Sequence, residues 1–176
     1  QNNEKSPQPA VEAKKPAAVV VARDTHTLTE RVKNALDRRP SLAGMPIGVE
    51  SQGDTVTISG KVASAYEAML AHRAVEQTPG VREVIDELEF QLPDENHPNP
   101  LIKKSRPDDL EPYLTTQIRR HVGELAYIAP VRVRGNHIEV HGTLLDEQSK
   151  PRVEAVLRSM PLLREFQIDH SFQIDR

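Results

Sequence analysis

Three polar side chains that could bind a metal ion stand two residues apart in the second half of the chain: His137, Glu139 and His141. On a β-strand, residues at this spacing project from one face, and zinc accepts two imidazoles with a carboxylate. The outer two would lie roughly 13 Å apart, too far to share one ion unless another element bends in. A solvent-facing strand surface explains the triplet better, so we predict no metal site and no cofactor.

Basic side chains could instead contact phosphate head groups. Arg132 and Arg134 alternate with the apolar Val131 and Val133, so both arginines should share the outer face of a strand. Glu139 is expected on the same face and would partly cancel their charge. Cross-strand charge pairs are the alternative use of these two arginines.

The helix expected to start near Asp108 or Asp109 combines apolar and basic character. Arg119 and Arg120 fall near its C-terminal end, where cations also interact favourably with the helix dipole, and Tyr113 adds apolar surface. A basic run in the preceding linker supplies three more charges, worth only about 3 kcal/mol near an anionic surface. The predicted lipid-binding residues are Lys103, Lys104, Arg106, Tyr113, Arg119, Arg120, Arg132 and Arg134.

Two titratable residues fall among apolar ones in the last strand of each half. Asp86 occupies an inward-facing place between Val84 and Leu88, so its carboxylate must find hydrogen-bond donors or lie at the sheet edge. His170 falls on the apolar face of the other strand. A core histidine with a hydrogen-bond partner is expected there, and a pH-sensitive switch is the alternative.

Several function classes are disfavoured by what the sequence lacks. We find no nucleophile elbow, phosphate-binding loop, dinucleotide glycine fingerprint or helical zinc motif. The absence of cysteine excludes disulfides and thiolate chemistry. A net charge of −3 argues against a general nucleic-acid binder, and the apolar run Ala17 to Ala22 is far shorter than the roughly 20 residues that span a bilayer. We therefore predict a protein that is not an enzyme.

The chain divides at two stretches without helical or strand periodicity. Residues 1–27 are rich in Pro, Ala and Lys and are predicted to form a flexible tail. Residues 93–107 contain four prolines, which remove backbone donors and disfavour helix, and are predicted to be a linker. Two domains are thereby expected, at residues 28–92 and 108–176.

Residues 28–92 predict the element order αββαβ. Apolar residues recur at helical spacing from Leu28 to Leu36, and strand-like alternation follows on both sides of a turn at Gly53-Asp54. Ser64 with Glu67 has the form of a capping box that starts a second helix. A closing strand is expected over residues 84–92.

Residues 108–176 repeat this order at a fixed offset. Gly60 to Pro79 has the same separation as Gly142 to Pro161, and PGVREVIDELEFQL aligns without a gap with PLLREFQIDHSFQI. The second hairpin turns at Gly135-Asn136, and Pro112 and Pro151 are each placed in the first turn of a helix, where proline is tolerated. We predict an α+β fold of two αββαβ modules, each with two helices on one face of a three-stranded mixed sheet.

The segment IGVESQGDTVTISGKVASAYEAMLAHRAVEQTPGVREVIDELEF resembles the BON domain family. Val56 to Val62 matches the family pattern V-T-[LI]-[ST]-G-x-V, and Gly80 to Val84 matches G-V-x-x-V. The second copy is divergent, since it keeps Gly142 but has Leu162 where the family has glycine. Its membership therefore depends on the internal repeat.

The resemblance implies a bacterial cell-envelope protein, periplasmic or secreted, without shared catalytic residues. BON domains associate with phospholipid surfaces or hold protein assemblies together. The expected function is a binding module for phospholipid membrane surfaces. The alternative is a scaffold that forms a homo-oligomer, or binds an envelope protein, through an open sheet edge.

Overall fold

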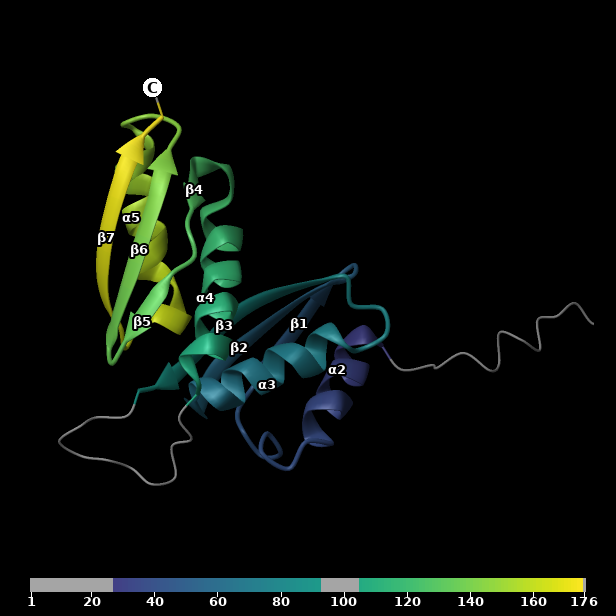
Figure 1. Ribbon diagram of the computed structural model, residues 1–176. Coiled ribbons are helices and arrows are strands. Elements are labelled where there is room, and N and C mark those ends of the chain that lie inside the picture. Colours follow the sequence, from purple (N-terminus) through teal and green to yellow (C-terminus); the bar gives the residue numbers. More distant parts are fainter. Residues whose placement is uncertain (1–26, 93–104, 176) are drawn as a thin grey trace, which may run out of the picture.

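The computed structural model describes residues 27–92 and 105–175, which form two α+β units with one sheet each (Figure 1). The mixed α+β class is confirmed at this level. Apart from Thr27, the predicted flexible tail lies outside the described residues. The predicted linker also lies outside them, except for residues 105–107.

The first unit has the predicted order αββαβ. Strand β2 pairs antiparallel with β1 and parallel with β3, so the sheet is mixed and has the order β1-β2-β3. Both helices of this unit pack against the sheet and against each other. The elements are α2 (Leu28–Asp37), β1 (Gly48–Gln52), β2 (Thr55–Ser64), α3 (Ala65–Glu76) and β3 (Glu83–Gln91).

The alternation of apolar residues along β2 and β3 builds the core of this unit. In the parallel register Val56 lies opposite Val84 and Val62 opposite Phe90, and all four side chains are buried. Because side chains two apart share a face, these residues form one apolar surface against the helices. The outer face of the same strands is mostly polar, with Ile85 as its one large apolar side chain.

The two helices of the first unit begin differently. A capping box starts α2: the Thr27 hydroxyl accepts a hydrogen bond from the N–H of Glu30, and the Glu30 carboxylate accepts one from the N–H of Thr27. The capping box predicted for α3 is wrong in form. Ser64 is the N-cap, but its hydroxyl donates to the Glu67 carboxylate and makes no bond to the helix backbone.

The second unit departs from the predicted three-stranded sheet by one additional strand. Its sheet contains four strands, all joined through β6. Its elements are α4 (Pro107–Val122), the 3-10 turn η1 (Gly123–Leu125), β4 (Ala126–Ile128), β5 (Arg132–Arg134), β6 (His137–Leu144), α5 (Ser149–Ser159), the 3-10 turn η2 (Pro161–Leu163) and β7 (Gln167–Ile174).

The additional strand arises from an interruption at Pro130. β7 runs parallel to β6 along its whole length, so β4 and β5 both pair with the opposite edge of β6. Between the pairs Ile128–Gly142 and Arg132–Glu139 the register shifts by one residue. Proline has no N–H to donate to a ladder, so the strand divides there.

One proline prediction for the second unit needs correction. α4 begins at Pro107, one residue before Asp108, so Pro112 lies beyond the first turn. Pro112 is exposed, where water can hydrate the carbonyl left without a helical donor. Pro151 lies in the first turn of α5, as predicted.

The second unit packs against the outer edge of β3, the last strand of the first sheet. The rings of Phe90 and Phe166 meet edge to face with centroids 5.9 Å apart, and Arg164 pairs with Glu89 at 3.0 Å. Figure 1 shows α4 beside β3. The first unit therefore does not present β3 as a free edge.

Arg120 of α4 completes this coverage at the start of β3. Its guanidinium donates to the backbone carbonyl of Val84 and to the carboxylate of Glu83. An edge-strand carbonyl that would otherwise face solvent thus has a charged donor from the other unit.

A buried carboxylate forms the centre of the contact between the units. Asp86 is 1% exposed and accepts hydrogen bonds from the Tyr113 hydroxyl and from the N–H of Leu88, the latter at 3.0 Å. Nδ1 of His72 lies 3.0 Å from the same carboxylate. The expectation that Asp86 needs donors or a sheet edge is confirmed in both respects. Burial, the charge of Asp86 and this hydrogen bond raise the pKa of Tyr113 well above 10.

Tyr113→Phe should lower the free energy of unfolding by about 1–2 kcal/mol near neutral pH, because it removes a buried hydrogen bond to a charged group. The difference from the native protein should shrink above about pH 10. There the unfolded native chain loses the Tyr113 proton while the folded state keeps it, so the native protein loses up to about 1.4 kcal/mol per pH unit. Urea unfolding at pH 8 and at higher pH measures both effects. Tyr127→Phe is the control, because that ring is 67% exposed.

Candidate anion-binding pocket

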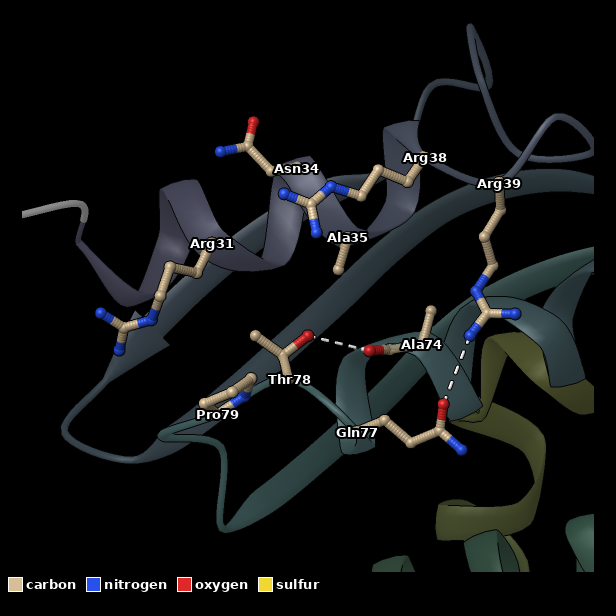
Figure 2. Close-up of a pocket in the computed structure, with 9 residues that line it drawn as sticks. All are labelled: Arg31, Asn34, Ala35, Arg38, Arg39, Ala74, Gln77, Thr78 and Pro79. Carbon is tan, nitrogen blue, oxygen red and sulfur yellow. Dashed lines mark hydrogen bonds between the residues drawn. The ribbon is translucent and has the colours of Figure 1, made fainter. Parts of the chain in front are cut away.

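A pocket of about 570 Å³ lies between one side of α2 and the end of α3 in the first unit. Its volume is within the range of sites for small molecules and head groups. Figure 2 shows its lining residues, which are Arg31, Asn34, Ala35, Arg38, Arg39, Ala74, Gln77, Thr78 and Pro79.

Three arginines give this lining its charge, and the lining residues include no aspartate or glutamate. Arg31 lies on α2 and Arg38 is its C-cap, seven residues or two helical turns later, so the two share one side of the helix. The opposite side of α2 is fixed in the core by Val32 and Leu36. Because α2 is amphipathic, its arginine side chains face the pocket while its apolar side chains face the core.

The far wall of the pocket is ordered by local hydrogen bonds. Arg39 donates from Nη2 to Oε1 of Gln77 at 3.3 Å, and the Thr78 hydroxyl donates to the carbonyl of Ala74 at 2.8 Å (Figure 2). Gly80 follows with φ +94°, and a Cβ there would lie 2.8 Å from Nη2 of Arg31. The turn after α3 thus lets the arginine approach the backbone closely.

The chemistry available in the pocket is anion binding. Guanidinium groups present paired N–H donors that match phosphate and carboxylate oxygens, and arginine stays charged at any physiological pH. Glu50, Glu87 and Glu89 project from the other face of the same sheet, so the first unit has a basic helical side near this pocket and an acidic sheet side. An anionic partner would meet the helical side first.

The lipid-binding residues predicted on α4 lie at the contact between the units. Tyr113 bonds to Asp86 and Arg120 to β3, so lipid contact at these two positions would require the units to separate. Arg119 is exposed: its Nε donates to the carbonyl of Ile128 at 2.8 Å, and its guanidinium lies 5.7 Å from the ring centroid of Tyr127.

The other predicted lipid-binding residues are dispersed. Arg132 and Arg134 are exposed on β5, and Arg134 lies 4.0 Å from Glu139. Arg106 is exposed just before α4 and pairs with Asp108 at 3.8 Å. Lys103 and Lys104 lie outside the described residues. The structure therefore does not gather the described members of the set into one site.

The histidines of the second sheet have separate environments. Nδ1 of His137 lies 3.0 Å from Asp169 across the strand pair, and no group of three or more metal-ligating side chains occurs within the described ranges. The expectation of a core position for His170 is wrong. Its side chain is 35% exposed and lies 3.8 Å from Glu154, because β7 is an edge strand that α5 covers incompletely.

Arg31, Arg38 and Arg39 were not identified as candidates from the sequence. The signal that could have found them is the heptad spacing of Arg31 and Arg38 on the polar side of an amphipathic helix. The spacing alone does not show that the end of α3 lies opposite and closes the pocket.

No curated protein matches the chain. Two solved structures of CdsD, a structural protein of the type III secretion system of Chlamydia trachomatis, are similar at 10% and 11% identity with a TM-score of 0.30. The similarity covers 86% and 84% of this chain but 66% and 62% of those chains, and a likeness at this level supports no conclusion.

In the part of the chain that the structure describes, no helix is both long and apolar enough to cross a membrane.

The first unit, which contains the arginine-lined pocket, is also the part of the chain that matches a known family. Residues 24–91 match the BON domain family.

Proposed function

We propose that this protein is a non-catalytic binding module of the bacterial cell envelope, and that it associates with phospholipid membranes through the arginine-lined pocket of its first unit. The observation that carries the proposal is a pocket of about 570 Å³ whose lining residues include three arginines and no aspartate or glutamate. The match of residues 24–91 to the BON domain supports the envelope setting.

The expected affinity follows from the charges. A basic side chain near an anionic membrane surface contributes about 1 kcal/mol, so three arginines contribute about 3 kcal/mol. The net charge of −3 on the whole chain opposes approach at long range. Binding should therefore be moderate, specific for anionic lipid and sensitive to salt.

Arg31→Gln/Arg38→Gln/Arg39→Gln should reduce binding to anionic vesicles about tenfold or more at low salt, because the phosphate-binding donors are lost. Co-sedimentation with anionic and neutral vesicles across a salt series measures this. The native protein should bind the anionic vesicles, and salt should release it.

The matched control is Arg106→Gln/Arg132→Gln/Arg134→Gln, which removes the same charge from three exposed positions of the linker end and β5. We expect this variant to bind within about twofold of the native protein, apart from the general charge effect. Equal losses in both variants, or no binding of the native protein to either vesicle, would overturn the pocket proposal.

Assembly with other protein chains is a second candidate function, and a different observation favours it. β3 is covered by the second unit, whereas β7 pairs with β6 alone among the described strands. A long open edge is a site for adding another strand. Membrane association and assembly use different surfaces and are compatible.

A further inference from the structure

β7 has the features of a strand that pairs with another chain. It has eight residues and contains no lysine, arginine or proline, the residues that commonly protect an exposed edge. β1, the other end strand of the first sheet, has five residues, and the β4–β5 edge is interrupted at Pro130. β7 is therefore the longest regular open edge within residues 27–92 and 105–175.

Two backbone hydrogen bonds, one at each end of β7, show which backbone groups of the strand face β6. The N–H of Gln167 donates to the carbonyl of Asn136 at 2.7 Å, and the N–H of Asp175 donates to that of Leu144 at 3.0 Å. Backbone groups alternate in direction along a strand, so the odd-numbered residues between them face β6. The residues whose N–H and C=O groups face outward are Ile168, His170, Phe172 and Ile174.

Three of these four residues carry apolar side chains that the second unit covers incompletely. Ile168 lies opposite the buried Ile138 of β6 and Ile174 opposite the buried Leu144. Phe172 shares their face of the sheet, so all three project toward the helical side, yet each is only half-buried. Figure 1 shows β7 as the outermost strand of this sheet. Another strand placed beside β7 would bury this apolar surface and bond the outward backbone groups.

The sequence of β7 is complementary to itself in the antiparallel sense. With a two-fold axis at Ser171, Ile168 lies opposite Ile174 and His170 opposite Phe172 of a second copy. Both pairs consist of residues whose backbone groups face outward, so each is a hydrogen-bonded pair of an antiparallel ladder. Apolar and aromatic side chains then meet on the helical side of the sheet.

The outer face of this pairing contains no opposed like charges. Asp169 lies opposite Gln173, and Ser171 lies opposite Ser171 of the second copy. We propose that the occupant of this edge is a second copy of the chain, joined β7 to β7 in this register, so that two sheets become one continuous sheet. This inference rests on the second candidate function, and it specifies the partner, the strand and the register.

Two lysine substitutions on the exposed outer face test the register. Ser171→Lys would place two like charges at the two-fold axis and should raise the dimer dissociation constant about fivefold. Gln173→Lys adds the same charge but faces Asp169 of the second copy, so dimerisation should be unchanged or stronger. Light scattering or sedimentation across a range of concentrations measures both, and circular dichroism checks the fold.

Amide hydrogen exchange by NMR gives a second readout. Raising the protein concentration should slow exchange at the outward amides of Ile168, His170, Phe172 and Ile174, with little change at those already bonded to β6. A monomer at every concentration would overturn both this inference and self-assembly as a function. An oligomer that responds equally to both lysines, without protection of the outward amides, would overturn the β7 inference and leave assembly through another surface.

Discussion

Phe90→Ala should lower the free energy of unfolding by about 3–5 kcal/mol, the range for deleting a buried aromatic side chain. Phe90 is 1% exposed on the inner face of β3 and meets Phe166 of the second unit edge to face. The substitution therefore leaves a cavity where the two units join. Chemical denaturation at neutral pH measures the loss.

Ile85→Ala is the control for Phe90→Ala, because Ile85 is half-buried on the outer face of the same strand. It should cost about 1 kcal/mol. A double-mutant cycle with Phe166→Ala should give a coupling of about 0.5–1.5 kcal/mol. Zero coupling would mean that the ring contact does not join the units in solution.

Gly60→Ala should cost about 2–5 kcal/mol, because the backbone at this position suits only glycine. Gly60 has φ +116°, and a Cβ there would lie 2.2 Å from the backbone carbonyl oxygen of Pro46. β2 or the segment before β1 must shift to relieve the overlap. Thermal or urea unfolding gives the magnitude.

Gly53→Ala is the matched comparison for Gly60→Ala. Gly53 has φ +64°, but nothing lies within 4 Å of its ideal Cβ. Both variants restrict the unfolded chain equally, so their difference isolates the steric overlap. Gly53→Ala should cost only about 1–2 kcal/mol, and equal losses would contradict the close approach at Pro46.

The fold of the first unit was predictable because local patterns and long-range pairing agree there. Alternation from Val56 to Val62 and the turn at Gly53 specify the hairpin, and the helix after Ser64 returns the chain to place β3 parallel to β2. The strand Ala126–Ile128 was not predicted, because three residues before a proline give too little pattern.

The sites were less predictable than the fold because they depend on contacts between distant residues. The position of Asp86 in its strand shows that its carboxylate needs a hydrogen-bond donor. That this donor is Tyr113, 27 residues away, is seen only once α4 has docked against the first unit. The same docking takes Arg120 out of the predicted lipid surface. The pocket requires one side of α2 to face the end of α3, which no single segment specifies.

The covered edge of β3 has a consequence for synthesis on the ribosome. The roughly 70 residues from the end of β3 to the end of η2 take on the order of 4–14 s to translate at about 5–20 residues per second. During that interval β3 is complete, but the elements that cover it have not all been made. Glu83, Glu87 and Glu89 lie along this strand, and their charges disfavour pairing with neighbouring nascent chains until the second unit arrives.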